Sequence, residues 1–301
     1  MTNVSNSIEY AGDIDNLISV DLYFDRHILN SQFMADLQSL LKKQLARWSK
    51  KLFYFRNAKT QFSIDIGEKN SLLSVLENEA SENGELYNQL VEEFGVGQER
   101  VCGTAEIRGA SRDIILVISF DELIFEPMAG KWIWGNSIHF DLENFTADDS
   151  NDRINSCRKL FLEAVRILKP SYATVQTKKE HDAKNMLSTP SIRAIGKDVS
   201  RYLPGVYWGN FFGPVYTKLI GDEALAGCSA HNITKTDDGF FIFLSEDPFD
   251  FGTSEYSAAE KQVSQRIGEC YFYSIDRDNS KAVAPNYGLP KLPQHPRFAD
   301  P

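Results

Sequence analysis

LPGVYWGNFFGPVYTKLIG, residues 203–221, is the stretch of this chain whose local structure is most strongly determined by its residues. Its first half is rich in β-branched and aromatic side chains, which favour a short buried strand, and Gly209 within that run indicates a bulge or a close backbone approach. Pro214 cannot donate to a strand ladder but suits the first position of a helix, and Gly221 can close that helix. We therefore expect a strand, a tight corner at Gly213 and a short helix. The stretch lacks the glycines and the lysine of a phosphate-binding loop, so a structural role is favoured.

Three β-rich segments lie earlier in the chain, at residues 102–108, 114–120 and 132–142. Glycine and proline mark the turns between them and no helix-forming segment intervenes, so consecutive antiparallel strands are expected rather than crossovers. Alternating or β-branched runs predict further strands, and an Asp-Gly pair at 238–239 predicts a hairpin between two of them. These further strands are expected at residues 17–24, 51–57, 61–66, 172–177, 206–212, 228–234, 240–244 and 270–275.

Helical spacing of apolar residues predicts the helices. The best of them begins near Ser150 and carries an apolar stripe until Pro170 forbids its continuation. Another follows an N-cap at Asn30 or Ser31, and a late helix starts from a capping box at residues 257–260. Two shorter helices are expected at residues 71–80 and 85–94.

The order of these elements predicts an α+β fold with a mainly antiparallel sheet and helices packed on one face. The polar segment 178–190 is interpreted as a connection. It either divides the chain into two α+β lobes, residues 1–180 and 181–285, or lies within one continuous domain. Residues 286–301 are rich in proline and are expected to form an extended tail.

Composition and charge narrow the functional classes. Hydrophobic content of 42% and charged content of 25% are those of an ordinary globular protein. A formal net charge of −10 argues against nucleic acid as the main ligand, because phosphate binding needs a basic field, but it suits a basic protein partner. The first residues lack the features of a secretory signal, and no apolar run approaches the length of a membrane helix. We therefore expect a cytoplasmic protein with no membrane contact.

The spacing of cysteines and histidines gives no metal or catalytic motif. The four cysteines lie dozens of residues apart without a CxxC pair, so we expect reduced, mostly buried thiols and no zinc site. The histidines are scattered over different elements, and His139, within a strand pattern, is expected to be half-buried or on the surface. No catalytic residue, cofactor or metal ligand is assigned. An enzyme whose site assembles only in three dimensions, or a cytoplasmic protein–protein adaptor, is the alternative function.

Charge distribution gives the strongest functional signal. Between Thr236 and Glu260 there are seven acidic residues and no Lys or Arg, interleaved with aromatic side chains. A negative surface with exposed aromatic anchors suits a basic partner, and Pro248 and Gly252 favour a protruding loop between them. A basic patch at residues 42–51 is the next candidate surface. The predicted partner-binding residues are Asp237, Asp238, Glu246, Asp247, Phe249, Asp250, Phe251 and Glu255.

Three segments resemble the immunity proteins of bacterial toxin systems, particularly the Imm52 group and the related type VI secretion immunity family. They are residues 132–138 (WIWGNSI), 168–175 (LKPSYATV) and 203–213 (LPGVYWGNFFG), within a region spanning roughly residues 100–245. The resemblance implies an α+β protein without enzymatic activity that binds and blocks a cognate toxin effector, often a nuclease, made by the same cell.

Overall fold

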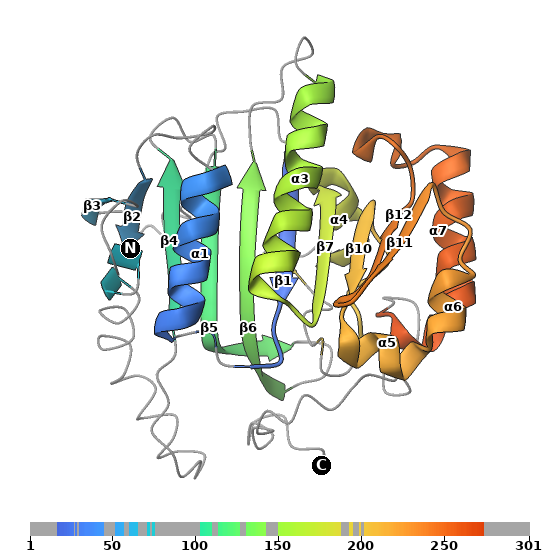
Figure 1. Cartoon of the computed structure of the whole chain (residues 1–301), viewed down its shortest axis with the longest axis horizontal. Helices are drawn as coiled ribbons and strands as arrows, with labels where there is room; N and C mark the ends of the chain where they lie inside the picture. Colours follow the sequence, from blue (N-terminus) through green and yellow to red (C-terminus); the bar gives the residue numbers. More distant parts are fainter. Residues whose placement is uncertain are drawn as a thin grey trace, which may run out of the picture.

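One antiparallel sheet organises the chain. The computed structural model describes residues 17–44 (except 27 and 29), 52–56, 60–65, 71–75 (except 73), 103–109, 114–126, 131–142, 150–187, 193–194, 199 and 202–273. Within them ten strands pair in the order β11-β12-β10-β7-β1-β6-β5-β4-β2-β3, and every neighbouring pair is antiparallel (Figure 1). The strands are β1 (Ile18–Tyr23), β2 (Leu52–Arg56), β3 (Thr60–Ile64), β4 (Gly103–Gly109), β5 (Ile114–Glu126), β6 (Lys131–Leu142), β7 (Tyr172–Thr177), β10 (Gly209–Phe212), β11 (Asn232–Thr236) and β12 (Gly239–Phe243).

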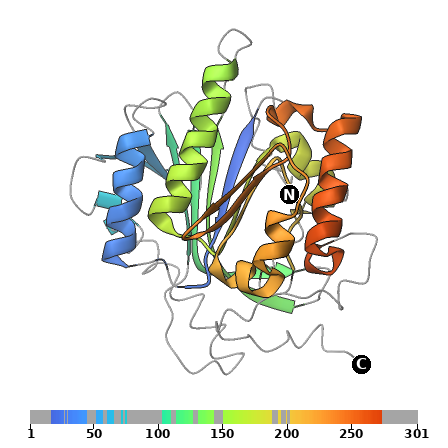
Figure 2. The ribbon, with the colours of Figure 1, turned by 45° about the vertical axis from the view of Figure 1, so that its right-hand side comes forward.

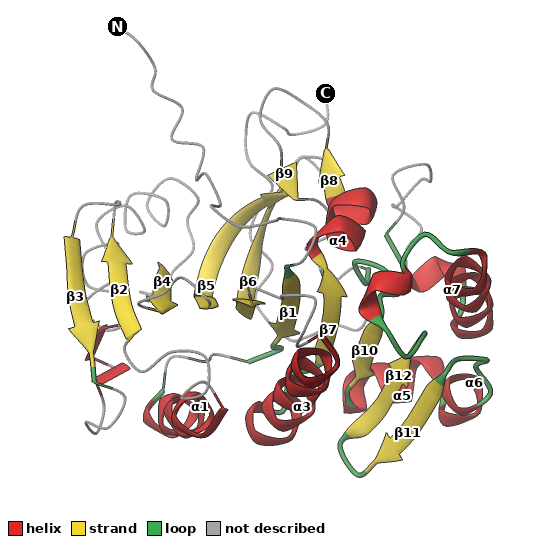
Figure 3. Ribbon diagram, turned by 90° about the horizontal axis from the view of Figure 1, so that it is seen from above, coloured by secondary structure: helices red, strands yellow, loops and turns green. Residues whose placement is uncertain are grey.

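The helices lie on both sides of this sheet. They are α1 (Ser31–Gln44), α3 (Ser150–Leu168), α4 (Lys178–Asn185), α5 (Pro214–Ile220), α6 (Asp222–Ala226) and α7 (Ser254–Ile267), with short 3-10 turns η4 (Pro248–Asp250) and η5 (Glu269–Tyr271). Helices α1 and α3 lie side by side over one face, and α4 lies on the opposite side together with the short hairpin of β8 (Met186–Leu187) and β9 (Arg193–Ala194) (Figure 3). The predicted α+β class with an antiparallel sheet is confirmed, whereas the helices, expected on one face, lie on both, because the predicted connection after β7 forms α4.

The two faces of the central strands differ in polarity. Val20 of β1 stands opposite Phe140 of β6 and Val175 of β7, so these buried side chains share one face. Helix α3 packs its buried Phe161 and Val165 into the same core. Because strand side chains alternate, the other face of β1, β6 and β7 carries mostly polar residues. That face holds Ser19, Asp21, His139, Asp141, Thr174 and Gln176.

Several predicted boundaries are confirmed. The segments at 102–108, 114–120 and 132–142 correspond to β4, β5 and β6, consecutive antiparallel strands as expected. Strand β5 is longer than predicted, because it continues past a register shift between Ser119 and Glu122 and ends at Glu126. Helix α3 ends at Leu168, two residues before Pro170. Asn30 caps α1, because its side-chain oxygen accepts the backbone N–H of Phe33 at 2.9 Å. Of the two shorter helices, residues 71, 72, 74 and 75 are helical, whereas 85–94 lies outside the described residues.

The strand expected over residues 206–212 is shorter than predicted. It begins at Gly209, because the Asn210 side chain satisfies the backbone of Tyr207 in place of a ladder partner. The Asn210 amide accepts from the Tyr207 N–H at 2.9 Å and donates to its carbonyl oxygen at 2.7 Å. The close approach predicted at Gly209 is confirmed, since a Cβ there would lie 2.5 Å from the Val175 side chain.

Four other predictions are corrected by local capping and pairing. The capping box at residues 257–260 is not used, because Thr253 caps α7 through its hydroxyl, which accepts from the Tyr256 N–H at 3.2 Å. The segment 178–190 is predicted to be a connection, yet its first eight residues form α4, supported by i,i+4 pairs such as Lys184–Glu180. Strand β11 starts at Asn232 rather than 228. Residues 269–271 form η5, and Phe272 makes only a single bridge to Leu203.

Candidate partner-binding surface

The acidic residues predicted to bind a partner lie at the two ends of the β11–β12 hairpin. Thr236 pairs with Gly239, so Asp237 and Asp238 form the two-residue turn at one end. Glu246 and the residues that follow it leave the other end of β12, toward α7 (Figure 2). A five-residue strand spans about 17 Å. The predicted set is therefore two acidic patches joined by the hairpin rather than one.

The η4 turn holds a phenylalanine at the surface. The Asp247 carboxylate accepts the backbone N–H of Phe249 at 2.8 Å, and the Ser245 hydroxyl donates to the Asp247 carbonyl oxygen at 2.6 Å. Pro248 is buried beneath the turn, whereas Phe249 is 37% exposed. The Asp247 side chain therefore stabilises the η4 turn. Phe249 is an exposed aromatic residue, as predicted.

Phe251 packs against other residues of this protein, so it is not a fully exposed anchor for a partner. It is half-buried, and its ring meets the Tyr256 ring edge-on with centroids 5.7 Å apart. The ammonium of Lys184 lies 5.4 Å from the centre of the same ring. Removing Phe251 would therefore disturb packing as well as any contact with a partner.

Two of the seven acids have cationic partners from other elements. Asp238 lies 3.6 Å from the Lys169 ammonium, which follows α3, and Glu260 lies 3.0 Å from Lys184 of α4. The acidic segment contains no Lys or Arg of its own. Both cations, Lys169 and Lys184, are brought to it from other parts of the chain by folding. Among the described residues no ion pair involves the other five acids, Asp237, Glu246, Asp247, Asp250 and Glu255. Glu255 lies in the first turn of α7, where its own backbone N–H and the Ser254 hydroxyl lower its pKa.

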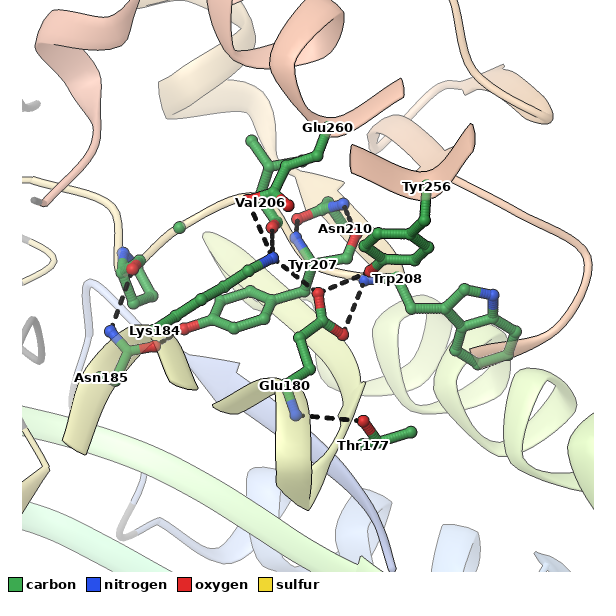
Figure 4. Close-up of polar contacts among 12 residues, drawn as sticks. Thr177, Glu180, Lys184, Asn185, Val206, Tyr207, Trp208, Asn210, Tyr256 and Glu260 are labelled. Carbon is green, nitrogen blue, oxygen red and sulfur yellow. Dashed lines mark hydrogen bonds and ion pairs between the residues drawn. The ribbon is translucent and has the colours of Figure 1, made fainter. Parts of the chain in front are cut away.

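A buried carboxylate ties α4 to this surface (Figure 4). Glu180 is fully buried, and it accepts hydrogen bonds from the Tyr256 hydroxyl at 2.5 Å, the Lys184 ammonium at 2.7 Å and the Trp208 backbone N–H at 3.3 Å. Lys184 also donates to the Val206 carbonyl oxygen at 2.6 Å. Burial raises the pKa of Glu180, while Lys184 and the hydrogen bonds oppose that rise. The network thus joins α4, residues 206–208 and α7.

Replacing Lys184 by methionine should lower the free energy of unfolding by roughly 1–2 kcal/mol at pH 8, because the buried Glu180 keeps two donors but loses its cation. The pKa of Glu180 is raised in the folded state, so a protonated Glu180 favours folding and this contribution fades as pH increases. The loss should therefore shrink at pH 5. Urea titrations at both values test this, with Lys184→Met/Glu180→Gln as the matched control that should recover stability at pH 8. Equal losses at the two pH values would contradict it.

A groove of about 550 Å³ runs between α3 and the hairpin. Phe241 and Phe243 of β12 lie along it, and α3 contributes Leu162, which is 37% exposed. Arg158 lies toward the η4 end, where it donates to the Glu246 carbonyl oxygen at 2.8 Å. The carboxylates of Asp237 and Asp238, in the hairpin turn, lie at the other end of the groove. The full lining is Arg158, Leu162, Val165, Arg166, His231, Asn232, Thr234, Thr236, Asp237, Asp238, Phe241 and Phe243.

A second charged cluster lies on the polar face of the central strands. The two ring nitrogens of His139 face Asp21 at 2.7 Å and Asp141 at 2.8 Å. The Ser19 hydroxyl donates to Asp141 at 2.5 Å, and the Gln176 amide donates to Asp21 at 2.5 Å. Burial alone would lower the pKa of His139, yet the two carboxylates raise it well above 6.5. Burial would raise the pKa of Asp21, but His139 brings it down to about 2.

This cluster does not have the order of a hydrolytic triad. Ser19 contacts Asp141 and not the imidazole, and both ring nitrogens already face carboxylates, so neither is available as a general base. His139 is half-buried, as the sequence predicted. Sequence reasoning missed the carboxylates beside it, although the i,i+2 spacing of Ser19 with Asp21 and of His139 with Asp141 places each pair on one strand face. Within the described ranges, no group of three or more His, Cys, Asp or Glu side chains could hold a metal ion.

The remaining sequence candidates are the basic patch and the cysteines. Of the basic patch at 42–51, Lys43 of α1 pairs with Glu163 of α3 at 3.2 Å, and residues 45–51 are outside the described part of the chain. Cys157 and Cys228 are buried and not in disulfide bonds, as expected, while Cys270 is exposed. None of the helices in the described ranges has the length and apolarity needed to cross a membrane.

Comparison with known proteins shows a similarity of fold to a solved structure. No family model matches the chain, and no curated protein matches its sequence. Among solved structures, the Pseudomonas aeruginosa T6SS (type VI secretion system) protein PA0821 is similar, with a TM-score of 0.51 and 12% sequence identity. The match covers 86% of this chain and 74% of the other. At that identity the likeness shows a shared fold over most of this chain.

Proposed function

We propose that this chain is an immunity protein of a type VI secretion setting, which binds a cognate toxin effector and blocks it by occlusion without catalysis. The observation that carries the proposal is the fold shared over 86% of the chain with a T6SS protein. The resemblance of the segments 132–138, 168–175 and 203–213 to immunity proteins supports the same assignment. A net charge of −10 suits a basic effector, such as a nuclease.

The acidic patches around the β11–β12 hairpin are the surface that we assign to this binding. Glu246, Asp250 and Glu255 carry charge without an ion pair among the described residues, and Phe249 lies exposed between them in sequence. Such a combination fits an interface with an aromatic anchor and a charged rim. The buried Glu180 network holds α7 in place before the partner arrives, and Asp247 holds the η4 turn.

The test is co-expression with the product of the reading frame beside this gene, taken as the candidate effector. Cells that make the effector should survive when this protein is present, and the purified proteins should form a complex. An occluding inhibitor protects only at about equimolar amounts, whereas an enzyme that modifies the effector or its target protects at far lower ratios. A protein–protein adaptor would give no protection. Titrating the expression ratio therefore separates all three functions.

Charge reversal at this surface should act mainly on association. Glu246→Lys and Asp250→Lys should each slow association and reduce its dependence on salt, because exposed charges steer the encounter. Asp247 is a poorer choice since it caps the η4 turn. The measurement is binding kinetics at two ionic strengths, with Asp36→Lys on α1 as a control of equal charge. A control variant that slows association as much would show only an effect of net charge.

Removing the aromatic anchor should act on dissociation. Phe249→Ala should speed dissociation and weaken binding by about 2 kcal/mol or more if this residue is a hot spot. Phe251→Ala is less informative because that ring packs on Tyr256. If Glu246→Lys, Asp250→Lys and Phe249→Ala combined in one chain protect cells and bind as the wild type does, this surface is not the interface.

A further inference from the structure

The outermost strand β11 leaves half of its backbone unpaired with other strands. It ends the sheet order, so β12 is its only strand neighbour in the described part of the chain. Thr236 and Gly239 close a two-residue hairpin, and such a closing pair exchanges both of its hydrogen bonds. Alternate pairs do the same, which directs the N–H and C=O groups of Ile233 and Lys235 to the outer edge. Ile233 and Lys235 thus offer two donors and two acceptors at regular strand spacing.

The groove beside α3 opens next to this edge. Thr234 and Thr236 line it from β11, and Leu162 faces it from α3. Figure 3 shows the hairpin alongside α3, with α6 on its other side. A strand added to β11 would place every second side chain over the groove. An apolar side chain there would cover Leu162, which is one of two large exposed hydrophobic residues among those described.

The charged groups at the two ends of the groove differ. Asp237 lies at the turn end, exposed and with no ion pair to any described residue. At the other end the Arg158 guanidinium lies 5.4 Å from the Trp208 ring, and its Nε is buried without an acceptor in the described ranges. A basic side chain would complement Asp237, and a carbonyl or carboxylate oxygen would complement the positive charge of the Arg158 guanidinium. These requirements describe an extended peptide and not a nucleic acid, whose phosphates Asp237 would repel.

We propose that an extended segment of the effector adds to the outer edge of β11 as an eleventh strand, with an apolar residue over Leu162 and a Lys or Arg at Asp237. The proposal rests on the proposed function, because it names how the same partner binds. Backbone hydrogen bonds along β11 would give affinity, and the groove would select the side chains.

Hydrogen exchange on the purified complex with the effector encoded beside this gene is the direct test. The amides of Ile233 and Lys235 should exchange at least about tenfold more slowly in the complex than in the free protein, because each then donates to the added strand. Protection that appears in the protein alone as its own concentration rises would identify the occupant as a second copy, and would overturn the choice of effector.

Paired substitutions test the edge and the groove separately. Lys235→Pro removes an outward N–H that the ladder does not use, and proline is tolerated at such edge positions. It should weaken binding about tenfold. Lys235→Ala is its control, since it loses the same contacts to Asp222 and Phe240 but keeps the N–H. Leu162→Glu should weaken binding about 30-fold, whereas Asn155→Glu, exposed on the same helix outside the groove lining, should not.

The outcomes separate this proposal from the function on which it rests. If the wild type neither binds the effector nor protects cells, the proposed function and the added strand are both wrong. If the wild type binds and protects but β11 amides exchange freely and Leu162→Glu binds normally, the proposed function stands and the added strand is wrong. Circular dichroism and urea titration of each variant show whether a loss of binding is a loss of folding.

Discussion

Trp208→Ala should lower the free energy of unfolding by roughly 3–5 kcal/mol, the usual range for truncating a buried large aromatic residue. Trp208 is fully buried, and its ring meets Phe243 edge-on with centroids 5.4 Å apart. Its indole N–H donates to the Ser245 carbonyl oxygen at 3.1 Å, at the point where β12 leads into the η4 turn. The truncation therefore removes core packing and one constraint on the proposed interface.

Urea unfolding followed by circular dichroism measures this loss. Phe249→Ala is the matched control, because it removes an aromatic ring that is 37% exposed and should change stability by less than about 1 kcal/mol. If Trp208→Ala changed stability as little as the control does, Trp208 would be a surface residue and a candidate for the interface.

His139→Leu should have the second-largest effect, about 3 kcal/mol at pH 7, because it leaves Asp21 and Asp141 facing each other without the cation between them. Asp21 and Asp141 are 15% and 8% exposed, so water screens their repulsion weakly. The triple variant His139→Leu/Asp21→Asn/Asp141→Asn, which removes the charges together, should recover part of the loss. A triple variant no more stable than the single one would show that packing and not charge holds this site.

The Asp21–His139–Asp141 cluster should stabilise the fold only over a limited range of pH. The pKa of His139 is raised above 6.5, so its stabilising contribution is fully present below that value and is lost as pH rises through the folded pKa. The pKa of Asp21 is lowered from 3.8 to about 2, so its contribution is present above 3.8 and is lost as pH falls toward 2. The gap in stability between wild type and His139→Leu should thus be widest between these limits. A gap that is constant from acid to alkaline pH would contradict the charge assignment.

The sequence predicted those parts of the fold that local chemistry determines. Turn residues between 102 and 142 were enough to predict three antiparallel strands, and Pro170 was enough to end α3. Helix α4 could not be predicted, because its polar residues look like a solvent-exposed connection. Only the fold shows that Glu180 is buried against Trp208 and Tyr256.

The candidate site was predicted in composition but not in arrangement. The sequence identified the acids and Phe249, but the pairing of Asp238 with Lys169 depends on how α3 packs beside the hairpin. The groove likewise needs both elements in place. The Asp21–His139–Asp141 cluster depends on strand register between segments 118 residues apart, which no local pattern encodes.

The central position of β1 has a consequence for synthesis of the chain. This first strand pairs with β6 and β7. During synthesis, Asp21 can therefore contact His139 only after 118 further residues have been added, and Gln176 only after 155. At a synthesis rate of 5–20 residues per second, the wait for His139 lasts roughly 6–24 s. During that time the nascent chain exposes Ile18, Val20 and Leu22, which are fully buried once the sheet forms. Folding of this chain therefore depends on keeping its apolar first strand from aggregating at the ribosome until β6 and β7 have been made.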